Sequence, residues 1–382
     1  MSEWKKVKLG EICERVTSGG TPKANVSSYY NPPTIPWLKT KEVNYCRITE
    51  TENYISEEGL KNSSAKIISP NSVIIAMYGQ GDTAGRIAIN KIPLATNQAC
   101  CNLTIDKSKA DYEFIYYQLC TLYDKLVSLK AGAAQPNLNA RIIKNLEIIM
   151  PSLPIQHRIA SILSRYDSLI ENYQKQIKLL GEAAQRLYKE WFIDLHFPGH
   201  ENTNIIDGVP EGWEKKKVGD ITPIITGKKD ANFGTPDGEY PFFTCSQEPI
   251  KAPSFSFDCA AVLLAGNGDF NVKLYRGRFE AYQRTYVLSP YIDSHLYLLF
   301  YTISANMTKL AAGSSGSTIK FLTKGMIDGI NLNVPNDEIL ESFNKKVEPI
   351  QSSRESLQSQ LRLLTEARDR LLPKLMSGEI TI

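Results

Sequence analysis

The sequence predicts a mixed α/β (α+β) protein made of two repeated modules, each followed by a long helix. Three observations predict this plan. A heptad pattern of apolar side chains starts near Pro154 and returns later in the chain at a constant offset of 184. Similar phrases, Trp4-Lys5-Lys6-Val7 and Trp213-Glu214-Lys215-Lys216, open the two modules at an offset of 209. Between each phrase and its helix, short apolar runs alternate with Gly, Asn and Pro, which is typical of strands and turns.

The first long helix is expected over residues 154–192, because apolar residues recur there every three or four positions. Pro154 is tolerated in a first turn, and Phe197-Pro198-Gly199 ends the pattern. About 38 residues at 1.5 Å each give a helix of roughly 57 Å, longer than a small domain needs for its own core. Such a helix needs a partner. Ala184 fills the only gap in its seam, which consists of Ile155, Ile159, Leu163, Tyr166, Ile170, Tyr173, Ile177, Leu180 and Leu187.

The partner is expected to be a second helix of the same chain, with the same pattern at an offset of 184. Its seam consists of Phe343, Val347, Ile350, Leu357, Leu361, Leu364 and Leu371. Arg354 and Arg368 stand where Ile170 and Ala184 stand in the first helix. Each arginine either pairs with an acidic neighbour or marks where the seam opens to a partner subunit. Because the first helix must deliver the chain to the second module, equivalent modules require the two helices to pack as an antiparallel coiled coil.

The repeat divides the chain into five segments. We expect a first module over residues 1–150, a first helix over 151–197, a linker over 198–212, a second module over 213–335, and a second helix with a C-terminal tail over 336–382. The offset falls from 209 at the opening phrases to 184 at the helices, so the second module is the shorter of the two. The modules therefore share a plan and differ in their loops, where specificity usually resides.

Composition limits the class of protein only loosely. The net charge of +3 and pI of about 8.3 neither require nor exclude nucleic acid. Seven cysteines without a Cys-x-x-Cys pair indicate a reduced, cytoplasmic protein without a zinc knuckle. The sequence has no apolar run of about 18 residues and no signal-peptide core, so neither membrane insertion nor export is expected.

Each module is expected to contain a strand that runs into a tight turn. Residues 72–77 lead into Gly79-Gln80-Gly81-Asp82, and residues 260–265 lead into Gly266-Asn267-Gly268-Asp269. One helix is expected in each module, over residues 111–130 and 294–310. Gly79-Gln80-Gly81-Asp82-Thr83-Ala84 nominally fits a dinucleotide fingerprint, but a strand pattern follows where that motif needs a helix. A hairpin turn is the simpler interpretation.

Two further motifs suggest chemistry and have simpler interpretations. Asn31-Pro32-Pro33-Thr34 resembles the Asn-Pro-Pro-aromatic motif of adenine methyltransferases, but Thr34 has no ring to stack on a flipped base. A proline-rich turn accounts for it. His196 and His200 are spaced like helical metal ligands, yet the proline and glycine between them prevent a helix. The sequence thus offers no catalytic residue and no metal site.

Four phrases carry a resemblance to the specificity subunits of type I restriction-modification systems. They are Ile35-Pro36-Trp37-Leu38-Lys39-Thr40, Thr96-Asn97-Gln98-Ala99-Cys100, Gly132-Ala133-Ala134-Gln135-Pro136-Asn137-Leu138, and Leu371-Leu372-Pro373-Lys374-Leu375-Met376-Ser377-Gly378-Glu379-Ile380. The plan of two modules, each with its helix, resembles that family over essentially the whole chain. The second module departs from the pattern, with Gln283-Arg284 and Gly313-Ser314-Ser315-Gly316-Ser317 at the corresponding places.

The resemblance implies a non-catalytic subunit with two target recognition domains. Each would recognise one half of a bipartite, asymmetric sequence in double-stranded DNA. The helices would set the distance between the half-sites and bind two modification (methyltransferase) subunits, with restriction or translocase subunits as further partners. S-adenosylmethionine, ATP and Mg would then belong to those partners, and this chain would hold no cofactor. Because the second module departs from the pattern, it should recognise different bases.

Candidate DNA-binding residues are those able to pair with bases or phosphates. Arg and Lys suit guanine, Asn and Gln suit adenine, and Lys, Ser and backbone amides contact phosphates. In the first module they are Ser18, Gly19, Thr21, Lys39, Lys41, Gln80, Arg86, Gln135, Asn137 and Asn139. In the second they are Lys228, Lys229, Asn267, Lys273, Arg276, Arg278, Arg284, Ser314, Ser315 and Lys320. The run from Lys273 to Arg278 is the densest, with three basic residues and no acidic one.

Two alternatives to a DNA-specificity subunit remain open at this point. A coiled-coil scaffold that binds only proteins would use the same helices and would show no steeply salt-dependent binding to duplex DNA. A self-contained adenine methyltransferase would need a glycine-rich cofactor loop, and the sequence contains no such loop ahead of Asn31. The loops of the modules distinguish the first alternative from DNA recognition.

Overall fold

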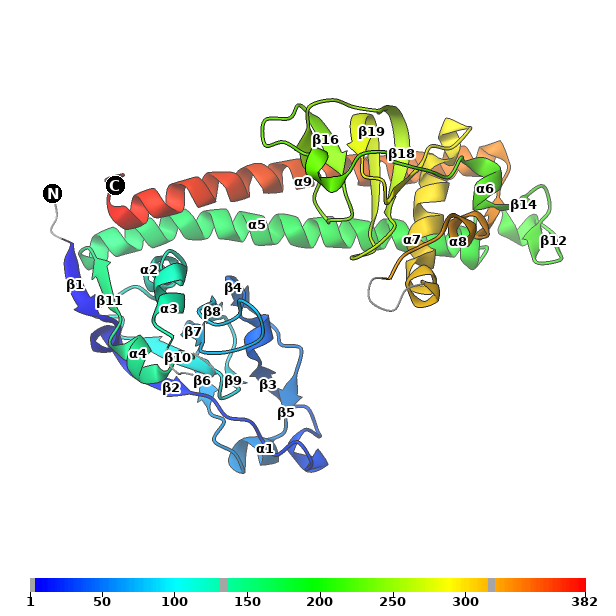
Figure 1. Ribbon diagram of the computed structural model, residues 1–382. Helices are drawn as coiled ribbons and strands as arrows, with labels where there is room; N and C mark the ends of the chain where they lie inside the picture. Colours follow the sequence, from blue (N-terminus) through cyan, green and yellow to red (C-terminus); the bar gives the residue numbers. More distant parts are fainter. Residues whose placement is uncertain (1–3, 131–136, 315–319) are drawn as a thin grey trace. The chain divides into compact units, whose positions relative to one another are not determined.

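The computed structural model describes residues 4–130, 137–314 and 320–382, and it divides into two compact units (Figure 1). The first unit comprises Met1–Asn172 and Gln360–Ile382, and the second comprises Tyr173–Ser359. Each unit contains one module together with parts of both long helices, α5 (Leu153–Tyr188) and α9 (Asp337–Ser377).

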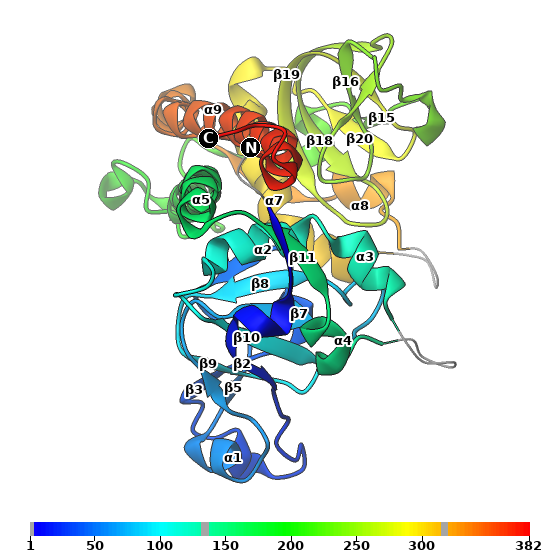
Figure 2. The same cartoon turned by 90° about the vertical axis from the view of Figure 1, so that its left-hand side faces the viewer.

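A five-stranded sheet forms the centre of the first module. Its strands, in spatial order, are β2 (Cys13–Ser18), β10 (Cys100–Ile105), β7 (Val73–Ala76), β8 (Ile87–Asn90) and β4 (Cys46–Ile48). All pairs are antiparallel except β8 with β4. Strands β7 and β8 are completely buried, which fits their apolar residues, and the buried Asn90 at the end of β8 is hydrogen-bonded to Ser69, Ser72 and Ile92. Helix α2 (Tyr112–Cys120) lies between this sheet and α5 (Figure 2).

A second sheet of the first module has its own small core around Trp37. Its strands are β5 (Tyr54–Ile55), β3 (Ile35–Leu38), β9 (Leu94–Thr96) and β6 (Ile67–Ile68). A separate pair, β1 (Lys5–Lys8) with β11 (Glu147–Met150), closes the module where α5 begins. The remaining helices of the module are α1 (Glu57–Lys61), α3 (Tyr123–Ser128) and α4 (Ala140–Lys144).

The single helix expected over residues 111–130 is in fact two helices, α2 and α3. Asp111 caps α2 as expected of a carboxylate at a helix start, accepting from the backbone N–H of Glu113 and Phe114. The helix ends at Cys120, and the hydroxyl of the following Thr121 donates to the carbonyl oxygen of Gln118 at 2.8 Å. Leu122, the residue before α3, leaves the helical conformation with a φ of −104° and a ψ of 17°, which separates the two helices.

The second module is built on a six-stranded sheet. Its strands, in spatial order, are β15 (Ile225–Thr226), β20 (Thr285–Leu288), β18 (Phe257–Ala265), β19 (Val272–Ala281), β16 (Tyr240–Phe243) and β17 (Ile250–Ala252). The pair β14 (Glu214–Lys217) with β21 (Asn331–Val334) closes this module as β1 and β11 close the first. Its helices are α6 (Val218–Ile221), α7 (Leu296–Gly313) and α8 (Lys324–Asp328), and the linker forms a hairpin of β12 (Ile205–Ile206) and β13 (Val209–Pro210).

The duplicated plan is confirmed by four pairs of equivalent elements. Strands β1 and β14 begin at Lys5 and Glu214, which is the offset of 209 that the opening phrases predict. Three later pairs keep the offset of 184: α4 with α8, β11 with β21, and α5 with α9. The remaining short helical turns are η1 (Leu9–Ile12), η2 (Ser27–Tyr29), η3 (Thr40–Glu42), η4 (Lys189–Ile193), η5 (His200–Asn202), η6 (Ala231–Phe233) and η7 (Asp293–His295).

Both long helices form, and every residue expected in their seam is buried or partly buried, including Ile155 at the edge of the first core. In the second unit, Gly181 of α5 lies against Arg354, and Trp191 in the helical turn that continues α5 lies against Phe343, so α5 and α9 run antiparallel there. The first unit contains the N-terminal part of α5 and the C-terminal part of α9, with Leu163 and Leu375 in one core.

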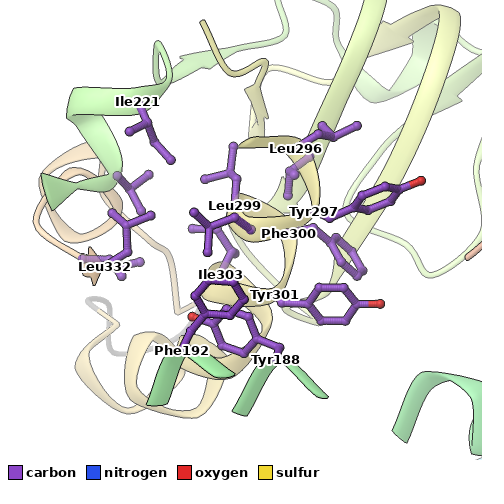
Figure 3. Packing of buried hydrophobic residues seen from close by; sticks show 14 of the residues in the cluster. Tyr188, Phe192, Ile221, Leu296, Tyr297, Leu299, Phe300, Tyr301, Ile303 and Leu332 are labelled. Atoms are coloured by element: carbon purple, nitrogen blue, oxygen red, sulfur yellow. The ribbon is translucent and has the colours of Figure 1, made fainter. Parts of the chain in front are cut away.

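An aromatic cluster joins the long helices of the second unit to α7. Tyr188 stacks on Phe192 and on Tyr301, with ring centroids 5.4 and 5.9 Å apart, and its hydroxyl contacts the hydroxyl of Thr302 at 3.0 Å (Figure 3). Phe192 meets Phe343 edge to face at 4.8 Å. Such pairs add to burial and fix the direction in which α7 leaves the helix pair.

The expected tight turns after β7 and β18 are longer loops, although both hairpins form. Strand β7 pairs antiparallel with β8, and β18 pairs antiparallel with β19. The loops span residues 77–86 and 266–271. A strand, and not a helix, follows residues 79–84, which confirms a hairpin there instead of a dinucleotide site.

Candidate nucleic-acid interface

In the first module, the loops that carry the candidate DNA-binding residues meet at the turn of residues 96–100, between β9 and β10. Gly20 donates its backbone N–H to the carbonyl oxygen of Thr96 at 2.9 Å, which brings in residues 18–21. Asn97 donates to Leu38 at 2.9 Å, which brings in residues 39–41. Residues 18–21, residues 39–41 and the turn of residues 96–100 are therefore neighbours through backbone hydrogen bonds.

The other two segments of the first module join the same turn through Met77. Met77 donates its N–H to the carbonyl oxygen of Ala99 at 2.8 Å, which places the β7–β8 loop beside the turn. Met77 in turn accepts from Leu138 at 3.0 Å, which adds residues 137–139. The structure thus brings the described parts of the four predicted stretches of this module together.

The second module repeats this pattern around residues 281–285. Gly227 donates to Thr285 at 3.1 Å, as Gly19 does to Cys100 in the first module. Tyr282 donates to Phe243 at 3.0 Å. Gly266 donates to Arg284 and accepts from Leu322, both at 2.8 Å. Equivalent loops therefore surround one turn in each module, and only their side chains and lengths differ.

Two glycines are required for this arrangement. A Cβ added at Gly19 would lie 2.0 Å from the carbonyl oxygen of Thr96, and one added at Gly227 would lie 1.9 Å from that of Ala281. Atoms cannot approach so closely, and both obstacles are backbone atoms that cannot rotate away. Glycine at these two positions lets the first loop of each module pack against its turn.

The first-module candidates differ in how available their side chains are. Lys41 is 85% exposed, whereas Lys39 extends over the Trp37 ring and donates to Asn53 at 2.9 Å. The hydroxyl of Thr21 donates to the side-chain oxygen of Gln98, and both residues are exposed. Ser18 and Gln80 are also exposed, and Arg86 is partly buried beside Asp82.

Asn139 has a structural role that explains its presence. Its side chain caps α4, accepting from the N–H of Ile142 at 3.0 Å. Asn137 is partly buried next to Leu138, whose N–H joins the β7–β8 loop. Gln135, a further candidate, lies outside the described residues.

The second-module candidates cluster in the same way. Lys228, Arg284 and Lys320 are exposed, and Lys229 lies over the Phe233 ring at 4.3 Å. Asn267 forms a β-bridge with Phe321, directly after Lys320. The Ser314 hydroxyl donates to Ala311 at the end of α7, which is a capping role, and Ser315 lies outside the described residues.

The run from Lys273 to Arg278 is not one basic surface. The ammonium of Lys273 donates to Ser246 at 2.7 Å and to the side chain of Asn271, so it belongs to the loop cluster, and burial lowers its pKa. Arg276 and Arg278 make contacts elsewhere. Arg276 lies 3.6 Å from Glu348 of α9 and over the Tyr297 ring, whereas Arg278 pairs with Asp258 at 3.0 Å. Side chains alternate across a strand, so residues 273 and 276 cannot share a face.

Three residues that sequence reasoning did not include lie at the centre of these clusters. Gln98 and Gln283 are exposed on the two equivalent turns, and Gln283 donates to Asp230 at 2.8 Å. Ser246 is exposed beside Lys273. The glutamines occur in the two related phrases around residues 98 and 283, and this repetition was the available signal.

A buried polar network fastens the first module to the long helices. Asp167 of α5 accepts hydrogen bonds from Tyr117 of α2 at 2.5 Å, from Arg47 of β4 at 2.8 Å, and from Arg368 of α9 at 2.9 Å. The side chains of Arg47 and Asp167 are each 7% exposed. Burial alone would lower the pKa of Arg47, but Tyr117 and Asp167 raise it above its ordinary value.

The second unit holds a version of this network in which an uncharged amide replaces the carboxylate. At the repeat offset of 184, Gln351 is the counterpart of Asp167 and Tyr301 is the counterpart of Tyr117. Gln351 donates to the Tyr301 hydroxyl at 2.7 Å. Arg354 donates to the side-chain oxygen of Gln351 at 2.9 Å. The sequence left open whether each seam arginine pairs with an acidic neighbour or marks an opening to a partner subunit, and the structure gives a different contact for each. Arg368 pairs with acidic neighbours, and Arg354 hydrogen-bonds to an amide.

Within the described ranges, no three His, Cys, Asp or Glu residues are grouped so that they could hold a metal ion. The rings of His196 and His200 lie 5.2 Å apart, and His200 contacts the carbonyl oxygen of Phe197. An open depression of about 420 Å³ lies between α3 and α4, lined by residues such as Leu129 and Arg141. No helix among the described residues is long and apolar enough to cross a membrane.

The architecture of two repeated α/β modules with equivalent polar loops, each followed by a long helix, fits the class of DNA-specificity subunits. The family described as type I restriction modification DNA specificity domain matches residues 1–180 and 210–357, and the chain belongs to this family. It is a non-catalytic DNA sequence-specificity subunit with two recognition domains. Neither a scaffold without DNA recognition nor a self-contained methyltransferase is favoured by this membership.

Some similar proteins span the whole chain, and others match part of it. The type I restriction enzyme MjaIX specificity subunit of Methanocaldococcus jannaschii is 28% identical, covering 100% of this chain and 94% of its own length. The type I restriction enzyme EcoDI specificity subunit of Escherichia coli is 36% identical over 45% of this chain and 40% of its own length. The S subunit of a type I restriction-modification system from M. genitalium has a solved structure with a TM-score of 0.69 at 17% identity, covering 98% of this chain and 96% of that one. This last similarity shows the fold.

Proposed function

We propose that each module recognises one half of a bipartite, asymmetric sequence in double-stranded DNA, and that the loops around residues 96–100 and 281–285 contact the bases. The observation that carries the proposal is the repetition of the same backbone hydrogen bonds in both modules, with different side chains on the loops. Two modules that recognise different sequences need the same backbone arrangement and loops with different side chains.

The side chains of the two clusters divide into two roles. Gln80, Gln98 and Arg86 in the first module, and Asn267, Gln283 and Arg284 in the second, have the amide and guanidinium groups that pair with base edges. Exposed Lys41, Lys228 and Lys320 suit phosphate contacts, which position a module without selecting a sequence. The two recognition modules are proposed to span residues 1–150 and 213–335, as expected from the repeat.

The long helices are proposed to bind the partner subunits. Leu169 and Leu179 of α5 and Leu363 of α9 are 44%, 52% and 54% exposed, and Leu179 and Leu363 are equivalent in the repeat. Apolar side chains exposed at equivalent positions suit two copies of one partner. We propose two modification (methyltransferase) subunits there, with restriction subunits as further partners and with S-adenosylmethionine, ATP and Mg bound by those partners. Helices α5 and α9 would set the number of base pairs between the half-sites.

The test is to map methylated adenines across the genome of cells that carry this chain with its modification subunits. A second strain carries the same chain with residues 213–335 replaced by the second module of a relative. We expect a bipartite motif of which only one half changes after the replacement. An unchanged motif in an assembled, active complex would contradict the proposal, and replacement of residues 1–150 is the matched control for the other half.

A further inference from the structure

The loop of residues 79–86 in the first module is held in one conformation by its own hydrogen bonds. The N–H and the hydroxyl of Thr83 both donate to the carbonyl oxygen of Gln80, at 3.4 and 2.7 Å. Arg86 donates its N–H to Thr83 at 3.1 Å. Gly85, at a φ of 95°, donates to Ala76 at 2.8 Å. A loop closed in this way presents its side chains with little conformational freedom left to lose on binding.

The guanidinium of Arg86 is fixed by its neighbours. Its Nη2 donates to Asp82 Oδ1 at 2.5 Å, and the side chain is 23% exposed. The Asp82 backbone oxygen accepts from the Tyr123 hydroxyl of α3 at 2.8 Å, so the residue that holds Arg86 is itself held. In the part of the chain that the structure describes, Asp82 is the sole side chain that pairs with Arg86.

Tyr45 forms an aromatic wall next to this pair. Its backbone N–H donates to Ile87 at 2.7 Å, and its ring lies 6.4 Å from the Tyr123 ring. Tyr45 has a φ of 53°, a conformation that is uncommon for a bulky residue and costs free energy. It is nevertheless 39% exposed. Tyr45 lies in the segment that begins at Lys39 and so belongs to the candidate interface.

An arginine held by a carboxylate matches the edge of one base in particular. Guanine presents two acceptors, O6 and N7, in the major groove, and a guanidinium donates to both at once. A fixed fork favours this bidentate geometry because the side chain does not have to be ordered during binding. An exposed ring next to the fork suits the apolar face of a neighbouring base or sugar.

We propose that Arg86, positioned by Asp82 and Tyr123, recognises a guanine in the half-site of the first module. The inference rests on the proposed function and goes beyond it by naming the base that is recognised and the residues that position the recognising side chain. Asp82 and Tyr123 are positioning residues, since they act through Arg86.

The second module cannot recognise guanine in this way. Asn271 takes the place of Arg86, because its carbonyl oxygen accepts from Ala265 at the end of β18 at 3.0 Å, as that of Arg86 accepts from Ala76 at 2.9 Å. Asn271 is 9% exposed, and its amide donates to the carbonyl oxygens of Cys245 and Asp269 at 2.9 and 2.7 Å. The side chain is therefore used inside the module, and the proposed guanine belongs to the first half-site only.

The test compares Arg86→Ala, Arg86→Lys, Asp82→Asn and Tyr123→Phe in the complex with the modification subunits. Methylation rates are measured on the mapped target and on targets with each base pair of the first half-site replaced. Arg86→Ala should reduce discrimination at a single G·C pair by about 10- to 100-fold. Asp82→Asn and Tyr123→Phe should reduce discrimination at the same pair by smaller factors. Arg86→Lys should keep the salt dependence of binding and lose the discrimination.

Asp269→Asn is the matched control, because Asp269 occupies the equivalent Gly-x-Gly-Asp loop of the second module. It should leave discrimination at that G·C pair unchanged. Wild-type discrimination at every position in Arg86→Ala, or in Arg86→Lys if the alanine variant does not assemble, would overturn the inference. So would an equal loss at all positions. Neither result touches the module replacement, whose failure alone would contradict the two-reader function.

Discussion

Asp167 of α5 and Arg368 of α9 are joined by a hydrogen bond of 2.9 Å, and the same carboxylate accepts from Arg47 of the first module at 2.8 Å. One acidic side chain therefore connects a recognition module to both long helices inside the first unit. In the second unit the equivalent residue is Gln351, which is uncharged. The repeat has kept the tyrosine of each network and changed the charge.

Replacement of Asp167 by Asn should destabilise the first unit by about 3 kcal/mol, because Arg47 would stay buried without its main counter-charge. Glu113 and Glu171, at 3.7 and 3.4 Å from Arg47, keep the loss near the lower end of the range for such pairs. Hydrogen exchange of β4 and α2 in the full chain would report the change. Asp369→Asn is the control, since Asp369 pairs with the same Arg368 but is 58% exposed. Equal effects of the two variants would contradict a role for the buried network.

Gly227→Ala should displace the first loop of the second module, because the new Cβ would lie 1.9 Å from the Ala281 carbonyl oxygen. We expect a loss of stability of about 1–3 kcal/mol, as for other overpacked sites, and weaker discrimination in the second half-site alone. Thermal unfolding and methylation of altered targets would measure the two effects. Gly325→Ala in α8 is the control, since nothing lies within 4 Å of its added Cβ. Unchanged stability in Gly227→Ala would show that the loop is free to move.

The sequence predicted the duplication well because both long helices carry a strongly periodic apolar pattern. This pattern returns at a single offset of 184. It predicted less of the site. The backbone hydrogen bonds that bring Gly20, Leu38 and Met77 to one turn join segments far apart in the chain, and no local pattern reveals such contacts. The role of Asp167 in holding the first module to the long helices could not be predicted from the sequence for a related reason. A charged residue next to a helical seam usually faces solvent, and only the fold places Arg47 beside it.

Cys100 and Cys101 should resist alkylation in the folded chain. Both are buried in β10, and burial raises the pKa of Cys101 to about 12 and that of Cys100 further still. A raised pKa leaves almost no reactive thiolate at pH 8, and labelling should appear only when denaturant unfolds the first module. Mass spectrometry after iodoacetamide treatment would measure this, with the partly exposed Cys245 as the comparison. Rapid labelling of Cys101 without denaturant would mean that β10 opens readily.

Two basic residues of β19, Lys273 and Arg276, should differ in effect when each is replaced by alanine. Lys273→Ala should weaken DNA binding through the second half-site, because its ammonium lies in the loop cluster beside Ser246. Arg276→Ala should leave discrimination between targets unchanged and reduce the stability of the second unit by up to about 1 kcal/mol, the usual limit for an exposed pair such as Arg276 with Glu348. Binding measured at several salt concentrations, together with denaturant unfolding, would distinguish the two. If Arg276→Ala instead lowered the salt slope of binding as much as Lys273→Ala does, β19 would present a continuous basic face to DNA, and the division seen in its contacts would not govern recognition.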